Sequence, residues 1–134
     1  MDKWIYVGVF LDEKSKEKLK RIYNIPEGWT EYFDHMTVVY NDGSEQAKSV
    51  KSICDTILGK QFKLQVSGTG ISDKAFAVSV NVPAGLPTNN KINHITLATS
   101  PTGKPVDSNY IENWNKLSKD NLYVTGILKV FKSN

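Results

Sequence analysis

The sequence predicts an α+β fold in which the helices lie outside and the faces of the sheet point inward, and three observations support this. Local patterns along the 134 residues follow the order strand, helix, strand, helix, strand, strand, strand, helix, strand. Hydrophobic residues make up 40% and charged residues 23% of the chain, which are ordinary values for a globular domain. No linker or low-complexity tract interrupts the chain, so residues 1–134 are expected to form a single domain.

The first half of the chain is expected to contain two strands and two helices. Asp12 can cap the first helix because its carboxylate can accept a hydrogen bond from a free backbone N–H of the first turn. Gly59 fits the end of the second helix. The expected elements are a strand at 4–11, a helix from Asp12 to about Tyr23, a strand at about 32–40 and a helix at about 45–58.

The second half is expected to begin with an antiparallel hairpin, because two strand-like runs are joined by the short turn Ser72-Asp73-Lys74. A loop rich in proline and asparagine follows. Asp107 can cap a third helix that ends near Ser118 and directs Trp114 toward the core. The expected strands are 61–71, 75–82, 92–99 and about 122–131.

Composition argues against several classes of protein. Cys54 is the only cysteine, so a disulfide framework is excluded, and its helical spacing with Val50 and Ile57 predicts a packed core thiol. The net charge of +3 allows an anionic ligand but is far from that of a protein that wraps duplex DNA. No run is long enough to span a membrane, and the apolar run at 4–11 lacks a cleavage site. We therefore expect a cytoplasmic protein, in the host cytoplasm if the chain comes from a phage, with no membrane or protein partner.

The two histidines of the chain lie in two similar segments, Asp34-His35-Met36-Thr37 and Asn93-His94-Ile95-Thr96, and each continues into strand-forming residues. Alternate side chains of a strand point to opposite faces, so each histidine shares a face with the threonine two residues later. Two such strands side by side would form a pocket with two imidazoles and two hydroxyls.

This group of side chains is suited to acid–base cleavage of a phosphodiester. One imidazole can accept a proton from the attacking hydroxyl while the other gives a proton to the leaving oxygen. The threonine hydroxyls can donate hydrogen bonds to the phosphoryl oxygens. With two histidines, one cysteine and no clustered carboxylates, the chain is poorly supplied for a transition-metal site, and we expect neither a metal nor another cofactor.

A purely structural role is the alternative for each motif taken alone. A single histidine on a strand is more often a structural residue than a catalyst, and the shape of threonine suits strands. Two copies of the motif that together use every histidine favour a functional role.

The paired His-x-Thr segments resemble the signature of the 2H phosphoesterase superfamily. The resemblance implies a bilobal fold in which antiparallel sheets line a central cleft and each lobe contributes one motif. It assigns proton transfer to His35 and His94 and phosphate binding to Thr37 and Thr96. The short chain is similar in size to compact phage enzymes that destroy cyclic-nucleotide immune signals, the anti-CBASS phosphodiesterases.

We therefore predict a metal-independent phosphodiesterase that cleaves a 3′,5′-linked cyclic oligonucleotide signal. One alternative is an RNA 2′,3′-cyclic phosphodiesterase of RNA processing or repair, and another is a nucleotide-binding protein that sequesters its ligand without turnover. An aromatic side chain could stack on a base, and a lysine near a strand end could attract phosphate. The candidate substrate-binding residues are Tyr6, Trp4, Trp29, Tyr32 and Lys91.

Overall fold

The architecture is mostly β, and the computed structural model describes residues 3–88, 90–116 and 122–132. The strands are β1 (Trp4–Leu11), β2 (Thr30–Glu31), β3 (His35–Tyr40), β4 (Gln61–Ile71), β5 (Ala75–Asn81), β6 (His94–Thr99), β7 (Trp114–Lys116) and β8 (Tyr123–Lys132). The helices are α1 (Glu13–Ile22), α2 (Glu45–Asp55) and the short 3-10 helix η1 (Pro105–Tyr110).

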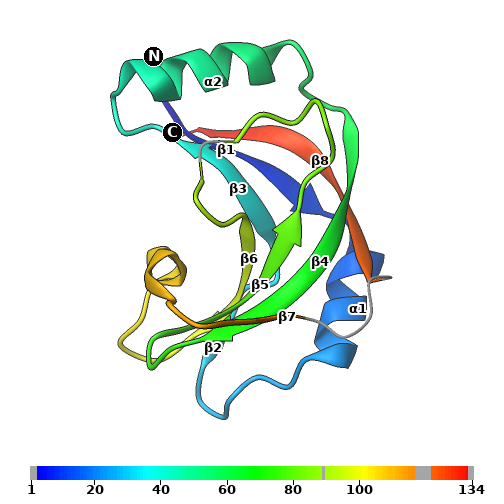
Figure 1. Cartoon of the computed structure of the whole chain (residues 1–134), viewed down its shortest axis with the longest axis vertical. Helices are drawn as coiled ribbons and strands as arrows, with labels where there is room; N and C mark the ends of the chain where they lie inside the picture. The colour runs from blue at the N-terminus through cyan, green and yellow to red at the C-terminus, as the bar shows by residue number, and fades with distance from the viewer. Residues whose placement is uncertain (1–2, 89, 117–121, 133–134) are drawn as a thin grey trace.

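Six antiparallel strands close into a ring, which makes the fold an antiparallel barrel (Figure 1). The order around the ring is β6-β3-β1-β8-β4-β5, and β5 pairs back with β6. The short strands β2 and β7 are added outside the ring, on β6 and on β4 respectively.

The predicted bilobal α+β fold with a cleft between two lobes is therefore wrong. The two motif strands, β3 and β6, do not belong to separate lobes but are direct neighbours in one sheet, paired at Met36 and Ile95. The order of elements could not reveal this arrangement, because the closure of a sheet depends on pairing between strands that are distant in sequence.

The first two helices and the hairpin are confirmed, but α2 ends at Asp55 with Thr56 as its C-cap, so Gly59 does not end this helix. Asp12 caps α1 by accepting a hydrogen bond from the backbone N–H of Ser15, and β4 pairs antiparallel with β5. The first motif strand begins at His35, later than predicted. Phe33 interrupts the extended backbone just before it with a φ of 49°, a value rare for residues other than glycine.

The third predicted helix is wrong. Residues Pro105–Tyr110 form a 3-10 helix, and Trp114–Lys116 form strand β7 on the edge of β4. Gly68 and Gly70 of β4 permit this pairing, because a Cβ at Gly70 would lie 2.7 Å from the Trp114 ring and one at Gly68 would meet the backbone of Asn115. The predicted end of the helix, at residues 117–118, lies outside the described residues.

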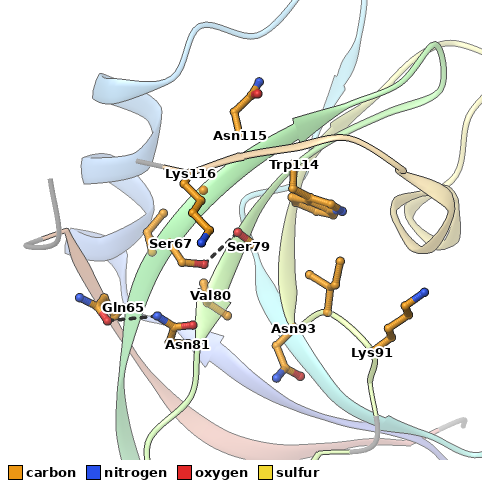
Figure 2. A pocket seen from close by; sticks show the side chains of 13 residues that line it. Gln65, Ser67, Ser79, Val80, Asn81, Lys91, Asn93, Trp114, Asn115 and Lys116 are labelled. Carbon is orange, nitrogen blue, oxygen red and sulfur yellow. Dashed lines mark hydrogen bonds between the residues drawn. The ribbon is translucent and has the colours of Figure 1, made fainter. Parts of the chain in front are cut away.

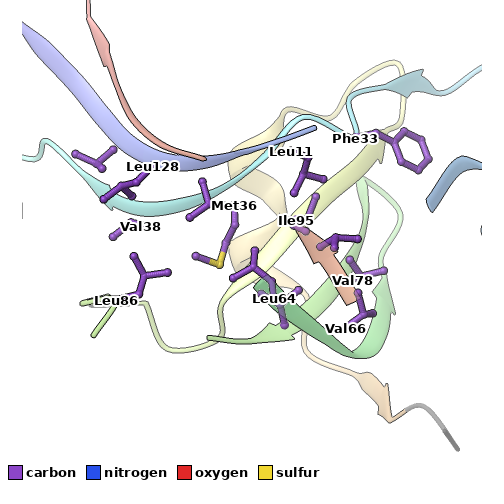
Figure 3. Packing of buried hydrophobic residues seen from close by; sticks show 14 of the residues in the cluster. Leu11, Phe33, Met36, Val38, Leu64, Val66, Val78, Leu86, Ile95 and Leu128 are labelled. Atoms are coloured by element: carbon purple, nitrogen blue, oxygen red, sulfur yellow. The ribbon is translucent and has the colours of Figure 1, made fainter. Parts of the chain in front are cut away.

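The main core lies on one face of the strands (Figure 3), and a smaller cluster of Ala75, Ala77 and Ile111 lies on the other face of β5. Leu19 of α1 joins the main core, as does Cys54 of α2, which is fully buried as predicted. Among the described residues, no helix is both long and apolar enough to cross a membrane. The strand residues of the core include Val7, Val9, Met36, Val38, Leu64, Val66, Val78, Val80, Ile95, Leu97, Val124 and Leu128.

Candidate active site

The two motifs project their polar residues away from the core. In β3, Met36 and Val38 are fully buried, whereas the alternating residues His35 and Thr37 are only partly buried. The first five residues of β6 repeat the burial pattern of β3, with His94 and Thr96 partly exposed and Ile95 and Leu97 buried. Each histidine therefore shares a face with its threonine, as the period of a strand requires.

Strand pairing brings the two motifs together. Met36 lies opposite Ile95, and the next step of the same antiparallel register places Thr37 opposite His94. Burial is the main cause that lowers the pKa of His94, and the charge of His35 lowers it further. The face thus presents two imidazoles and two hydroxyls from neighbouring strands.

His35 is held by hydrogen bonds at both ring nitrogens. Its Nδ1 lies 3.1 Å from a carboxylate oxygen of Asp34, and its Nε2 lies 3.1 Å from the hydroxyl of Thr37. Burial lowers the pKa of His35, and the Asp34 carboxylate opposes this shift by stabilising the charged ring. Lys16 of α1 lies 3.5 Å from the other oxygen of Asp34, so the carboxylate links α1 to the imidazole.

Aromatic rings of β1 flank the His35 imidazole. Tyr6 stacks on it with a centroid distance of 4.7 Å, and Phe10 does so at 5.2 Å. Gly8 lies between these two residues, and a Cβ there would approach the His35 ring to 3.2 Å, so a residue without a side chain permits this close packing. Phe131 of β8 extends the stack, 5.0 Å from Tyr6 and 46% exposed.

Within the described part of the chain, His94 is hydrogen bonded through one ring nitrogen. Its Nδ1 lies 3.0 Å from the backbone carbonyl of Ile92, which can only accept, so Nδ1 carries a proton and Nε2 can accept one. Burial lowers the pKa of His94, the carbonyl of Ile92 opposes the shift, and His35 adds to it. The Trp114 ring lies 6.3 Å from the His94 ring.

The second threonine and the loop before β6 are also anchored. The hydroxyl of Thr96 lies 2.8 Å from that of Ser108 in η1, and Ser108 is only 1% exposed. Asn90 donates from its side-chain nitrogen to the backbone carbonyl of Thr37 at 2.6 Å. These bonds tie η1 to β6 and the loop to β3.

A hollow of about 670 Å³ lies beside His94 and is lined by residues of the loop before β6, η1 and the segment after η1. We call it the histidine hollow. Its lining includes Lys91, which the sequence singled out as a candidate phosphate-attracting residue. The volume falls within the range of about 300–1,000 Å³ typical of small-ligand sites.

None of the four candidate aromatic residues lines this hollow, and His94 is the one motif residue in its lining. Trp4 packs against the core, and Lys51 of α2 lies over its ring. Trp29 and Tyr32 flank β2, which pairs with β6 at Thr99, the opposite end of the strand from His94. Of the predicted aromatic residues, Tyr6 is the one in ring contact with a motif histidine.

Sequence reasoning missed several residues that contact the motifs. Phe10 was detectable because residues 6, 8 and 10 share one face of a strand. Asp34 immediately precedes a histidine, but nothing in the sequence showed that its side chain turns toward the ring. Ser108 and Phe131 reach the site only through tertiary structure.

The site residues are suited to proton transfer and to anion binding. Among the described residues, no group of three or more histidine, cysteine, aspartate or glutamate side chains is placed to hold a metal ion. The set instead offers two imidazoles for proton transfer and two hydroxyls for phosphoryl oxygens.

A family match over most of the chain, together with the paired motifs, places the protein in the class of 2H phosphoesterase-type domains. Over residues 13–131 the chain matches the family described as the fungal tRNA ligase phosphodiesterase domain, and the chain belongs to this family. No curated protein sequence matches it.

Among solved structures, the chain is similar to one described as the crystal structure of fungal RNA kinase. The TM-score is 0.72 at 15% sequence identity, and the match covers 96% of this chain and 45% of the other. The likeness shows a shared fold, and this chain spans less than half the length of that protein.

Proposed function

We propose that the protein is an RNA 2′,3′-cyclic phosphodiesterase that opens a cyclic phosphate at an RNA end. The observation that carries the proposal is the juxtaposition of His35 and His94 on neighbouring strands. In the reaction, the oxygen of water bonds to phosphorus and one ring P–O bond to the ribose breaks. One imidazole takes the proton from water and the other gives a proton to the ribose oxygen, which leaves a phosphomonoester.

The surroundings of the two histidines favour a division of roles. The Asp34 carboxylate 3.1 Å from His35 stabilises the protonated ring, whereas the charge of His35 disfavours protonation of His94. Two titratable groups whose environments separate their pKa values are the usual arrangement of an acid and a base. We therefore assign His35 as the general acid and His94 as the general base of ring opening.

Thr37 and Thr96 hold the phosphoryl group in this mechanism. Each hydroxyl can donate a hydrogen bond to a non-bridging oxygen whose charge changes in the transition state. Their existing partners, the His35 ring and Ser108, fix the positions of these hydroxyls before substrate binds. When His35 is protonated, its Nε2–H donates to the Thr37 oxygen, which leaves the Thr37 hydroxyl proton free for a phosphoryl oxygen. To protonate the ribose oxygen, Nε2–H must then turn from Thr37 to that oxygen.

Membership of a family described by a tRNA ligase favours an RNA end as substrate. On sequence alone, the short length of the chain favours a cyclic oligonucleotide as substrate. The family match does not support that substrate or the assignment to the anti-CBASS branch. A sequestering protein with the same fold would bind an RNA end and return it unchanged.

Product analysis on a substrate panel tests the proposal. The panel contains an oligoribonucleotide that ends in a 2′,3′-cyclic phosphate, a 3′,5′-linked cyclic dinucleotide and a matched linear RNA without the terminal ring. We expect only the first to react, giving a phosphomonoester that incorporates one oxygen from labelled water, as measured by mass spectrometry. Cleavage of the cyclic dinucleotide alone, or recovery of every substrate intact, would contradict the proposal.

A further inference from the structure

A second hollow adjoins the histidine hollow (Figure 2). Its volume is about 550 Å³, and residues of β4, β5, β7 and the loop before β6 line it. We call it the side hollow. Lys91, Ile92 and Trp114 line both hollows and thus form the boundary between them.

Strand pairing connects the side hollow to the motif histidines. His94 lies opposite Ser79 of β5, Ser79 lies opposite Gly68 of β4, and Gly68 lies opposite Lys116 of β7. Neighbouring strands are about 4.8 Å apart, so Ser79 is one strand spacing from His94 and Lys116 about three. This row of residues runs from the predicted reaction centre into the side hollow.

The floor of the side hollow is built from hydroxyls. The Ser67 and Ser79 hydroxyls are 2.9 Å apart, and Ser79 is only 9% exposed. Figure 2 shows this pair between the side chains of Asn81 and Lys116. A β-bulge between Val66 and Gly68 accompanies this stretch of the pairing between β4 and β5.

The lining is polar and carries positive charge. Amide side chains of Asn81 and Asn93 supply both donors and acceptors, and Lys91 and Lys116 are cationic. The described residues that line the side hollow include no carboxylate. This combination fits a ligand that is anionic and also has many hydrogen-bonding groups.

Trp114 forms a fixed aromatic wall between the two hollows. Its indole N–H donates to the carbonyl of Ile111 at 3.2 Å, and its ring packs over Gly70, where a Cβ would come within 2.7 Å. A side chain that is already ordered loses little conformational entropy when a base stacks on it. Stacking on aromatic rings is a common way to bind single-stranded RNA.

We propose that the side hollow is a subsite for the nucleotide adjoining the terminal one, so that the substrate is an oligoribonucleotide and not a cyclic mononucleotide. This inference rests on the proposed function. The terminal nucleotide occupies the histidine hollow, and the next base stacks on the Trp114 wall. The linking phosphate is bound by Lys116, and the hydroxyls and amides contact the ribose and the base edge.

The test compares kcat/KM for a nucleoside 2′,3′-cyclic monophosphate with that for a trinucleotide that ends in the same cyclic phosphate. The wild-type protein should prefer the trinucleotide by at least about tenfold, the factor that 1.4 kcal/mol of added binding supplies. Lys116→Glu should remove most of this preference and leave the mononucleotide unaffected. Lys14→Glu, an exposed lysine of α1, is the charge-matched control and should change neither value.

The outcomes separate this inference from the proposed function. The subsite is overturned if the wild type has equal kcat/KM for both substrates, or if Lys116→Glu affects both substrates equally. Either result leaves the proposed ring-opening activity standing. Reaction of neither substrate overturns the proposed function. In that case the subsite is tested by the affinity for a 3′-phosphorylated trinucleotide, measured by calorimetry. The variants are Lys116→Glu and Ser67→Phe, whose larger side chain would fill the side hollow. If both variants bind the trinucleotide with the affinity of the wild type, the subsite is overturned.

Discussion

Asp34 and His35 are neighbours in sequence, yet their side chains are hydrogen bonded, with the carboxylate oxygen 3.1 Å from the imidazole Nδ1. Successive residues of a regular strand point to opposite faces and could not meet in this way. The left-handed backbone of Phe33 breaks the regular pattern, and β3 begins only at His35. The irregular entry into the strand thus places a carboxylate behind the imidazole, where it orients the ring and favours its charged form.

Asp34→Asn is expected to shift one limb of the pH dependence of kcat/KM. The carboxylate raises the pKa of His35, so its removal lowers that pKa. His35 must be protonated to act as the acid, and the alkaline limb should therefore move to lower pH while the acid limb stays in place. Asp55→Asn, on the exposed ion pair with Lys51, serves as the control. Movement of the acid limb would show that His35 does not have the higher pKa of the pair.

His35→Ala and His94→Ala should each reduce turnover of an RNA 2′,3′-cyclic phosphate by about 10²–10⁴-fold, the usual contribution of a proton-transfer group. Circular dichroism and thermal unfolding should show that both variants remain folded, because neither ring belongs to the core cluster. Near-normal turnover by either variant would rule out the two-histidine mechanism.

The choice of leaving group can distinguish the acid from the base. An aryl phosphodiester, whose leaving oxygen is a weak base, needs little protonation as it departs. His35→Ala should therefore lose much less activity on this substrate than on the RNA end, whereas His94→Ala should lose activity on both. If the aryl substrate restored the activity of His94→Ala and not that of His35→Ala, His94 would be the acid and His35 the base.

A chelator should leave activity unchanged, because the two imidazoles account for both proton transfers without a metal-bound water. We would measure turnover after dialysis against excess chelator, with and without added divalent ions. Loss of activity that a divalent ion restores would point to a different mechanism.

The sequence predicted local structure better than global structure, for physical reasons. The cap at Asp12 and the β4–β5 hairpin depend on interactions between residues close in the chain, and both predictions hold. The pairing of β3 with β6 depends on contacts between residues about 60 positions apart, for which the sequence gives no direct signal. The prediction of a third helix rested on apolar residues at helical spacing. It was wrong because Trp114 instead pairs with Gly70 in the sheet.

The same distinction applies to the candidate site. Strand period alone placed each histidine on one face with its threonine, and the structure has this arrangement. Ser108, which is hydrogen bonded to Thr96, and Phe131, which stacks on Tyr6, come from elements distant in the sequence, so strand period could not reveal them. Trp4 and Tyr6 were both candidate substrate-binding residues, but the register of β1 shifts between them and Trp4 packs against the core.

A comparison of Thr96→Val with Ser108→Ala separates phosphate binding from a structural role of Thr96. Both substitutions remove the 2.8 Å hydrogen bond between the two hydroxyls. Thr96→Val leaves the buried Ser108 hydroxyl without this partner, which costs about 1–3 kcal/mol of stability, whereas water can reach the partly exposed Thr96 hydroxyl in Ser108→Ala.

If the Thr96 hydroxyl binds the phosphoryl group, Thr96→Val should lower kcat about 10²-fold or more, as removal of a transition-state donor does. Ser108→Ala retains that hydroxyl and should keep activity within a few-fold of the wild type. Urea unfolding of both variants, measured beside their turnover of an RNA 2′,3′-cyclic phosphate, relates activity to stability. Equal loss of kcat in the two variants would mean that Thr96 acts only by anchoring η1, and the phosphate would then depend on Thr37 and the histidines alone.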